Sequence, residues 1–395
     1  MPRIVIVGAG PAGLAAAQTL AGELTATDDT EVLVLEKSKY YYHAIGVPRA
    51  FVDAAFTNKL FIPYDNAIPK AARGFVKFQR ALVTRIVPGA NEVEYAPIGE
   101  DDDTLAGPVK SLSYDYLVLA TGGTYATPIK QPKNNFKRAT TEAKFAEVRT
   151  EIEKAGSVLI VGGGPVGVEV AGEIKAKFPK KTVTILESKD KLVSGANVRD
   201  KFRNKLTRYL KRLDVKVITG ERLESPLAGN TFETRTLRTD KGTEITSDVQ
   251  LLLAGFSPAA DLVQKLDASL VTAQGAIKVN DKFQLASPEY ANVYALGDAS
   301  NHATPKMAYW AGQQGKHLGA ELALVARKSQ ENVVKAFPKP AVDMLVVPLG
   351  PNGGVAQLPV LGGLVAGNLV TRTIKSKEYF VSQTWSSLGA TAPTK

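Results

Sequence analysis

The sequence of 395 residues contains no cysteine, and this absence excludes several kinds of chemistry. A chain without cysteine forms no disulfide, offers no thiolate ligand to a metal and lacks the redox-active cysteine pair of a disulfide reductase. If the protein carries out a redox reaction, its electrons must pass to an acceptor that meets the cofactor directly.

Long apolar runs and metal-binding patterns are also missing. No apolar run approaches the roughly 18 residues of a membrane-spanning helix, so membrane contact would be peripheral. The three histidines, His43, His302 and His317, show no metal-ligand spacing, and we expect no metal site. A strand pattern begins at residue 4 and Pro2 stands where N-myristoylation requires glycine. We therefore expect neither a signal peptide nor this lipid anchor, and a protein that is not secreted.

Positive charge is abundant. The formal net charge of +10 favours contact with polyanions such as lipid headgroups, nucleic acid or the pyrophosphates of cofactors. A basic amphipathic helix is expected over residues 199–216; its cations are most simply solvated, and nucleic acid would bind only non-specifically, if at all. The length predicts two or three domains of roughly 150 residues each.

A duplicated unit decides the architecture. Residues 4–13, with the sequence IVIVGAGPAG, recur at 158–167 as VLIVGGGPVG. In each copy an apolar strand leads into a glycine turn and a helix, and a second strand ends in an acid, Glu36 or Glu187. This order is typical of a βαβ dinucleotide-binding unit, so the sequence predicts two of them.

Each residue type in the glycine turn has a physical purpose. The first glycine permits the tight bend, the second lets backbone N–H groups approach a pyrophosphate, and the third allows close packing of helix on strand. The helix N-terminus attracts the anion, and the acid accepts hydrogen bonds from a ribose. The predicted contacts in the first unit are Gly8, Gly10, Pro11, Ala12, Gly13 and Glu36. In the second unit they are Gly162, Gly164, Pro165, Val166, Gly167 and Glu187.

A third motif distinguishes FAD from a nicotinamide dinucleotide. Gly297 and Asp298 follow a short apolar strand, and Thr304 and Pro305 predict a helix start with an N-cap threonine and an N1 proline. An acid there can hold the ribityl hydroxyls of a flavin, and the helix would direct N–H groups to its N1/O2 edge. FAD is therefore assigned to the first unit. Its further predicted contacts are Lys37, Val83, Thr121, Gly122, Lys306, Met307 and Ala308.

The second unit would then bind NADH or NADPH. Gly255 follows the last apolar strand of this unit, as Gly122 follows the corresponding strand of the first, and is a further predicted contact. The Glu187 carboxylate would bond a ribose 2′-OH and repel a 2′-phosphate, which favours NADH. Lys189, two residues on, partly offsets this repulsion and leaves NADPH open.

Taken in this order, the motifs resemble a known family. The chain is similar to the AMID and ferroptosis-suppressor branch of the apoptosis-inducing-factor-like proteins, which are FAD-dependent pyridine nucleotide oxidoreductases. The resemblance covers nearly the whole chain. It is carried by residues 161–169, 171–174, 239–244, 292–298, 304–309 and 373–382 and by Trp385.

This resemblance implies an FAD-dependent NAD(P)H:quinone oxidoreductase, in which hydride passes to flavin N5 and two electrons then pass to a quinone. Glu169 matches an acid beside the nicotinamide and the flavin, and Arg49 matches a flavin-region arginine. Lys375, in a Lys/Arg-rich segment expected to be a strand, matches a basic residue near the isoalloxazine. Glu169 and Lys375 are therefore the candidate catalytic residues.

The resemblance also implies properties beyond the reaction. The FAD would be unmodified or 6-hydroxylated, and the protein would be a monomer or a homodimer. We expect a cytoplasmic location, with peripheral attachment to the mitochondrial outer membrane, a lipid droplet or the plasma membrane as the alternative.

The predicted fold class is α/β, with two Rossmann-type, doubly wound, three-layer domains of the glutathione-reductase type and a C-terminal β-rich α+β domain. The FAD-binding domain is discontinuous and comprises residues 1–130 and 282–335; residues 131–281 form the NAD(P)H-binding domain and residues 336–395 the C-terminal domain. Two other functions stay open. One is a flavin-stabilised basic scaffold that binds nucleic acid or an anionic membrane in a cell-death or stress pathway, and the other is a ferredoxin or rubredoxin reductase.

Overall fold

The computed structural model describes residues 1–99, 103–125, 128–195, 197–327, 334–338 and 344–393. Its first α/β unit is built on a seven-stranded sheet. The strands are β1 (Arg3–Val7), β2 (Glu31–Glu36), β5 (Val76–Val87), β6 (Glu92–Pro97), β7 (Lys110–Ser113), β8 (Tyr116–Leu119) and β17 (Val293–Ala295). They lie in the order β17-β8-β1-β2-β5-β6-β7, parallel from β17 to β5 and antiparallel from there on.

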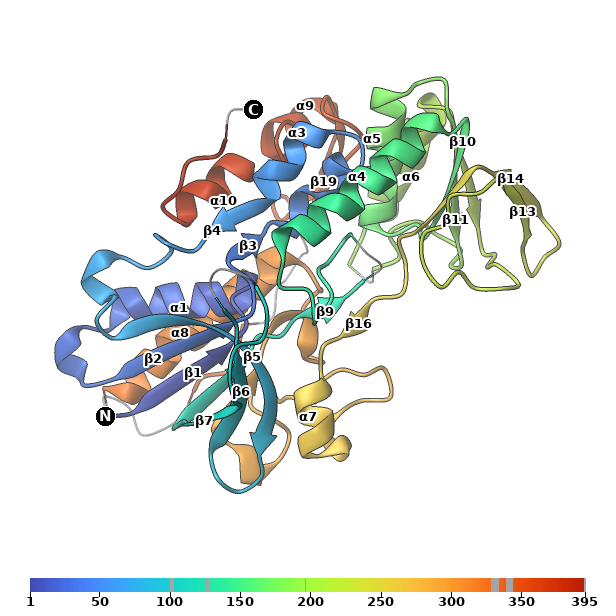
Figure 1. Cartoon of the computed structure of the whole chain (residues 1–395). Helices are drawn as coiled ribbons and strands as arrows, with labels where there is room; N and C mark the ends of the chain where they lie inside the picture. Colours follow the sequence, from blue (N-terminus) through green and yellow to red (C-terminus); the bar gives the residue numbers. More distant parts are fainter. Residues whose placement is uncertain (100–102, 126–127, 196, 328–333, 339–343, 394–395) are drawn as a thin grey trace.

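The central strands of this sheet are buried apolar runs, as expected where helices or loops cover both faces of a parallel sheet. Ile4, Ile6, Val32 and Val34 are inaccessible to solvent. Two helices, α1 (Pro11–Glu23) and α8 (Ala308–Ala326), pack against each other beside this sheet (Figure 1). The start of α1 is fixed by Pro11, because proline at the first helical position needs no hydrogen-bond partner for its nitrogen.

The second α/β unit repeats this construction on a smaller scale. Its sheet has the parallel order β12-β11-β10-β15, and an antiparallel hairpin of β13 and β14 extends from it. The strands are β10 (Ser157–Val161), β11 (Thr182–Glu187), β12 (Val215–Thr219), β13 (Arg235–Arg238), β14 (Glu244–Ser247) and β15 (Val249–Leu252). The helices are α4 (Arg138–Lys154), α5 (Pro165–Lys177) and α6 (Asp200–Arg212).

The chain passes between the two units twice, and the two crossings pair with each other. β9 (Gly123–Thr124) and β16 (Ser257–Pro258) form a short antiparallel ladder that lies between the units in Figure 1. The first sheet takes β17 from the chain that follows this second crossing. It is therefore assembled from segments on both sides of the second unit in sequence.

Shorter elements complete the first unit. An antiparallel pair is formed by β3 (Tyr40–Tyr42) and β4 (Phe61–Pro63), and the chain between them holds two short helices. These are α2 (Val47–Ala50) and α3 (Ala54–Thr57); a further helix, α7 (Asp261–Leu266), follows β16. The parallel sheets of the two units confirm the predicted α/β fold class.

The C-terminal part begins with an antiparallel sheet of β18 (Leu345–Pro348), β19 (Gly354–Leu358) and β20 (Leu364–Ala366). It continues with α9 (Asn368–Thr371), a π-helical turn (Arg372–Ser376) and α10 (Val381–Ser387). The strand expected around Lys375 is therefore wrong. Contacts of its backbone carbonyls with the buried Arg49 guanidinium instead hold this segment as a helical turn.

The helix predicted to begin at Thr304 and Pro305 begins instead at Ala308, with Met307 as its N-cap residue. This prediction is wrong because the Thr304 hydroxyl has other partners. It accepts a hydrogen bond from the Gln314 side-chain amide and lies 3.1 Å from Nδ1 of His302. The capping function that the sequence suggests is thus replaced by a buried side-chain network.

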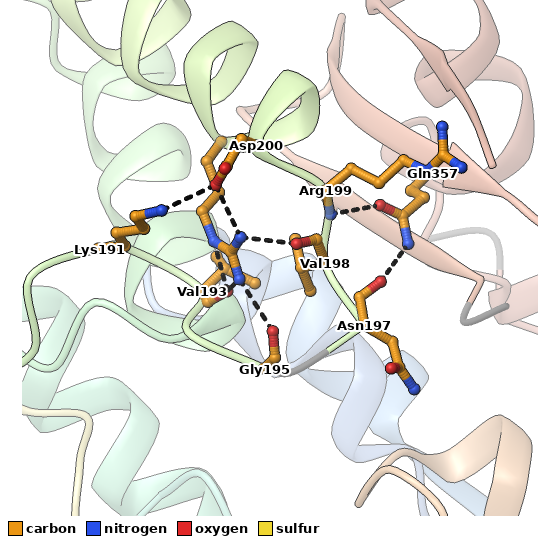
Figure 2. A network of polar contacts seen from close by, with 9 residues as sticks. Lys191, Val193, Gly195, Asn197, Val198, Arg199, Asp200 and Gln357 are labelled. Carbon is orange, nitrogen blue, oxygen red and sulfur yellow. Dashed lines mark hydrogen bonds and ion pairs between the residues drawn. The ribbon is translucent and has the colours of Figure 1, made fainter.

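The C-terminal part contacts both units. Trp385 donates a hydrogen bond from Nε1 to the Lys59 carbonyl of the first unit. Figure 2 shows its connection to the second unit, where the Gln357 side chain on β19 accepts from the Arg199 backbone N–H and donates to the Asn197 carbonyl. In the part of the chain described by the structure, no helix has the length and apolar character needed to cross a membrane.

Candidate functional site

A cavity of about 540 Å³ opens at the carboxyl ends of the central strands of the first unit. This is where parallel α/β sheets bind ligands, because the glycine turns and helix N-termini meet there. Most of the residues predicted for FAD line it. They are Gly8, Gly10, Pro11, Ala12, Glu36, Lys37, Val83, Thr121, Gly122, Gly297, Asp298, Lys306 and Ala308.

The glycine turns of the two units have the same geometry. Gly8 and Gly162 have φ values of +94° and +124°, and a Cβ on either would lie within 2.7 Å of a carbonyl oxygen of the neighbouring strand end. Only glycine tolerates both constraints. A Cβ on Gly10 would instead meet open space, and Gly10 lines the cavity, which leaves room for a pyrophosphate against the backbone.

The acids at the strand ends are also held alike. Glu36 accepts hydrogen bonds from the backbone N–H of Ala9 at 2.6 Å and of Ser38 at 2.8 Å. Glu187 accepts from the N–H of Gly163 at 2.7 Å and of Lys189 at 2.9 Å. Each carboxylate is thus fixed beside its glycine turn with lone pairs left for a ribose.

Asp298 lies at the cavity wall and pairs with Lys130 across 2.8 Å. On the same wall, the Lys306 ammonium donates to the carbonyl oxygens of Gly297 at 3.2 Å and Ser300 at 2.6 Å. Burial lowers the pKa of Lys306, although the Asp298 charge opposes this shift. The cavity wall therefore offers both an acid for hydroxyl groups and cations for a pyrophosphate.

Part of the cavity wall is formed by the connector between the units, and none of its residues was predicted. Lys130, Gln131 and Lys133 line the cavity there, as does Tyr42, whose hydroxyl donates to the Pro128 carbonyl at 2.6 Å. The Lys37 ammonium donates to the Pro132 carbonyl at 2.5 Å, and burial lowers the pKa of Lys37 to about 8. The only signal in the sequence was a group of lysines between the two repeats.

Three residues assigned to FAD lie elsewhere. Gly13 packs beneath the Gly8 turn, and Met307 is the N-cap residue of α8. Arg49 does not line the cavity; its buried guanidinium forms two hydrogen bonds with Glu173, at 2.8 and 3.0 Å. Its partner Glu173 lies on α5, 124 residues away in sequence, and a contact of Arg49 with the flavin stays a prediction.

In the second unit, Val166 also lines the cavity, so the two units meet there. The other residues predicted for NAD(P)H lie outside the cavity lining. Gly162, Gly164, Pro165 and Gly167 form the turn and first residues of α5, Glu187 ends β11, and Gly255 follows β15 with a φ of +84°. Their contacts with the nucleotide stay predictions.

The two candidate catalytic residues meet in the interior. Glu169 on α5 is 3% exposed, and its carboxylate oxygen lies 2.6 Å from the ammonium nitrogen of Lys375. The ammonium also donates to the Val346 carbonyl at 3.1 Å. Burial raises the pKa of Glu169, and the positive charge of Lys375 only partly opposes this. The pair lies one helical turn from Val166 and hence close to the cavity.

Two dinucleotide folds of the same construction, with a cavity between them whose wall suits a flavin dinucleotide, define a flavin-dependent oxidoreductase. Residues 2–315 match the family model of the pyridine nucleotide-disulphide oxidoreductases, and the chain belongs to this family. It is an enzyme that uses FAD and NAD(P)H. The open turn at Gly10 and the acids Glu36 and Asp298 fit FAD in the first unit.

Comparison with individual proteins confirms the predicted resemblance. Ferroptosis suppressor protein 1 of Homo sapiens is 29% identical over 396 residues, which cover 99% of this chain and 97% of that protein. Apoptosis-inducing factor homolog B of Dictyostelium discoideum is 28% identical over 99% of this chain and 98% of its own. The sulfide:quinone oxidoreductase of Aquifex aeolicus has the same fold, with a TM-score of 0.74 at 16% identity over 100% of this chain and 93% of its own.

Proposed function

We propose that the protein is an NAD(P)H:quinone oxidoreductase. The observation that carries the proposal is the buried pair of Glu169 and Lys375 beside the cavity, in a chain without cysteine. When bound, FAD would accept a hydride from NAD(P)H and pass two electrons to the acceptor. Because no thiol is available, the acceptor must reach the cavity itself.

The residues of the chain have separate tasks in this proposal. Glu36 and the backbone at Gly10 hold the ribose and pyrophosphate of FAD, and Asp298 holds its ribityl chain. Glu187 selects NADH, so kcat/KM should be higher for NADH than for NADPH. The FAD is unmodified or 6-hydroxylated, which mass spectrometry of the extracted flavin distinguishes.

Reduction of a quinone to a quinol consumes two protons as well as two electrons. Lys375 has a proton to give from its ammonium nitrogen, and Glu169 lies close enough to take part in its exchange. A buried ion pair is expensive unless it is well bonded, so its position beside a cofactor cavity favours a chemical role. Glu169 also limits the cost of keeping Lys375 charged in a largely buried position.

A surface near α6 suits attachment to an anionic membrane, where a quinone would be found. Residues 359–369 carry no charged side chain, yet Leu361 is 89% exposed and Leu369 is 78% exposed. Arg199 packs against Gly363 and Lys205 lies close to Gly367. Exposed aliphatic side chains with flanking cations match the boundary between acyl chains and anionic headgroups.

A comparison of acceptors tests the proposal. The purified protein, with NADH as donor, should reduce a short-chain ubiquinone faster than it reduces ferredoxin, rubredoxin or oxygen. Faster reduction of a ferredoxin or rubredoxin would instead support a reductase for a redox protein. If turnover is negligible with every acceptor while DNA or anionic vesicles bind in a salt-sensitive way, the basic scaffold becomes the better account.

A further inference from the structure

Two carboxylates project from the same side of α5 into the interior. Glu169 and Glu173 are four residues apart, and each is 3% exposed. Each meets a cation from a different part of the chain. Glu169 pairs with Lys375 of the C-terminal part at 2.6 Å, and Glu173 pairs with Arg49 of the first unit at 2.8 Å. The cluster therefore joins all three parts of the molecule and is neutral as a whole when both pairs are charged.

Arg49 uses two further donors on the backbone that follows Lys375. Its guanidinium donates to the Ser376 carbonyl at 2.7 Å and to the Lys377 carbonyl at 2.8 Å. It also lies 4.9 Å from the ring centre of Tyr379, whose hydroxyl donates to Glu173 at 2.9 Å. One side chain thus contacts both the partner carboxylate on α5 and the turn that carries Lys375.

The chain just after this turn has an unfavourable backbone conformation. Tyr379 and Phe380 have φ values of +53° and +61°, in the left-handed region that aromatic residues rarely adopt. Two adjacent residues of this kind cost conformational free energy, which the surroundings must offset. The contacts that offset this cost include those of Arg49, the Tyr379 hydroxyl bond to Glu173, and a 2.7 Å hydrogen bond from Nε2 of His43 to the Tyr379 carbonyl.

We propose that Arg49 is a positioning residue for the Lys375–Glu169 pair. Its positive charge neutralises Glu173, so that Lys375 pairs with Glu169 alone. Its hydrogen bonds to the backbone also fix the turn that places the Lys375 side chain beside α5. Without Arg49, Glu173 would be left as a buried carboxylate near Lys375, and the turn would relax. The proposal rests on the function proposed above for this pair.

The test compares Arg49→Met and Arg49→Lys with a matched control, Arg149→Met. Arg149 also connects two parts of the molecule, donating to the Ala50 carbonyl at 3.0 Å and to the Thr57 hydroxyl at 2.7 Å, but it has no hydrogen bond to the Glu169 and Glu173 cluster. All variants are purified with FAD, and their flavin content is measured. Flavin reduction by NADH and reoxidation by a short-chain ubiquinone are then followed in single turnovers across a range of pH.

We expect Arg49→Met to keep its FAD but to reoxidise about tenfold to a hundredfold more slowly, in line with misplacement of a reacting group. Its pH profile should also differ from that of the wild type, because the charge balance around Glu169 and Glu173 is altered. Arg49→Lys should recover part of the rate, and Arg149→Met should keep both rate and pH profile. An unchanged rate and profile in Arg49→Met, or the same change in Arg149→Met, would overturn the proposal.

A second measurement does not depend on turnover. Acylation of Lys375 by an amine-specific reagent, followed by mass spectrometry with the exposed Lys211 on α6 as an internal reference, reports on the turn directly. The ratio of Lys375 to Lys211 labelling should rise in Arg49→Met and stay at the wild-type value in Arg149→Met. An unchanged ratio in Arg49→Met contradicts the positioning role. Failure of the wild-type protein to reduce any quinone would contradict the proposed function alone.

Discussion

The ammonium group of Lys375 lies 2.6 Å from the carboxylate of Glu169, although 206 residues separate them in sequence. Glu169→Gln would replace the anion with an amide and leave the Lys375 cation without a buried counter-charge. We expect FAD to stay bound, while the rate of the slower half-reaction falls by about a hundredfold, the size typical of a lost acid–base group.

Single-turnover kinetics measure this rate. Glu147→Gln, at an exposed pair with Lys144, is the control and should match the wild type; a wild-type rate in Glu169→Gln would contradict the assigned role.

The wall of the cavity gives a prediction for cofactor affinity. Asp298→Ala removes the acid proposed for the ribityl hydroxyls and leaves Lys130 unpaired beside the cavity. Hydrogen bonds to charged groups contribute about 1.5–3 kcal/mol, so the Kd for FAD should rise about tenfold to a hundredfold. Fluorescence titration of the apoprotein with FAD measures this. Asp261→Ala breaks the exposed pair with Lys133 at the same wall and should have little effect; equal losses would show that Asp298 has no special part in binding.

The uncharged segment of residues 359–369 gives a prediction for membrane binding. The wild-type protein should sediment with vesicles containing anionic lipid and much less with neutral ones. Leu361→Asp should abolish this binding, whereas Leu105→Asp, at another exposed leucine in the first unit, should not. Equal binding to neutral vesicles would count against the headgroup contacts. Self-association lost in Leu361→Asp, without vesicle binding, would identify the surface as a contact between copies.

His43 gives a prediction for the pH dependence of stability. Burial lowers its pKa to about 4, well below the ordinary value of 6.5. As the pH falls through 6.5, His43 is therefore protonated in the unfolded chain but stays neutral in the folded protein. The free energy of unfolding then decreases between about pH 6.5 and pH 4. From pH 7 to pH 5 this one group should cost about 2 kcal/mol of unfolding free energy.

Urea unfolding of the wild type and His43→Gln at pH 7 and pH 5 isolates the contribution of His43. Glutamine can still donate to the Tyr379 carbonyl but does not titrate, so the variant should lose less stability over this range. His317→Gln, at a partly exposed histidine, is the control and should lose as much as the wild type. If His43→Gln behaves like the wild type, the buried imidazole is not the source of the acid sensitivity.

Much of the fold could be predicted because its signals are local. The strand, glycine turn and helix of each repeat lie within about 30 residues, and the residue types in the turn are dictated by sterics and by the ligand. Asp298 was found in the same way, at the end of an apolar strand. These positions occupy the cavity wall or its supporting turn in the structure.

The relationships that escaped prediction depend on residues far apart in sequence. The residues near Arg49 in sequence do not indicate that it will pair with Glu173. Those near Lys130 likewise do not indicate its pair with Asp298. The start of α8 was predicted too early because the buried Thr304 hydroxyl bonds to the Gln314 side chain and does not cap the helix. Lys375 was predicted to lie in a strand, but tertiary contacts hold its segment in a π-helical turn, and these contacts come from residues far away in sequence.

The central claim is that one cavity mediates electron transfer from a nicotinamide dinucleotide to a quinone without a thiol. Double-mixing stopped-flow under anaerobic conditions tests it most directly, with NADH added first and a short-chain ubiquinone second. The account predicts that the flavin absorbance bleaches with NADH and returns with the quinone, both faster than steady-state turnover. A flavin that stays oxidised in NADH, or that is reduced but ignores the quinone, would contradict it.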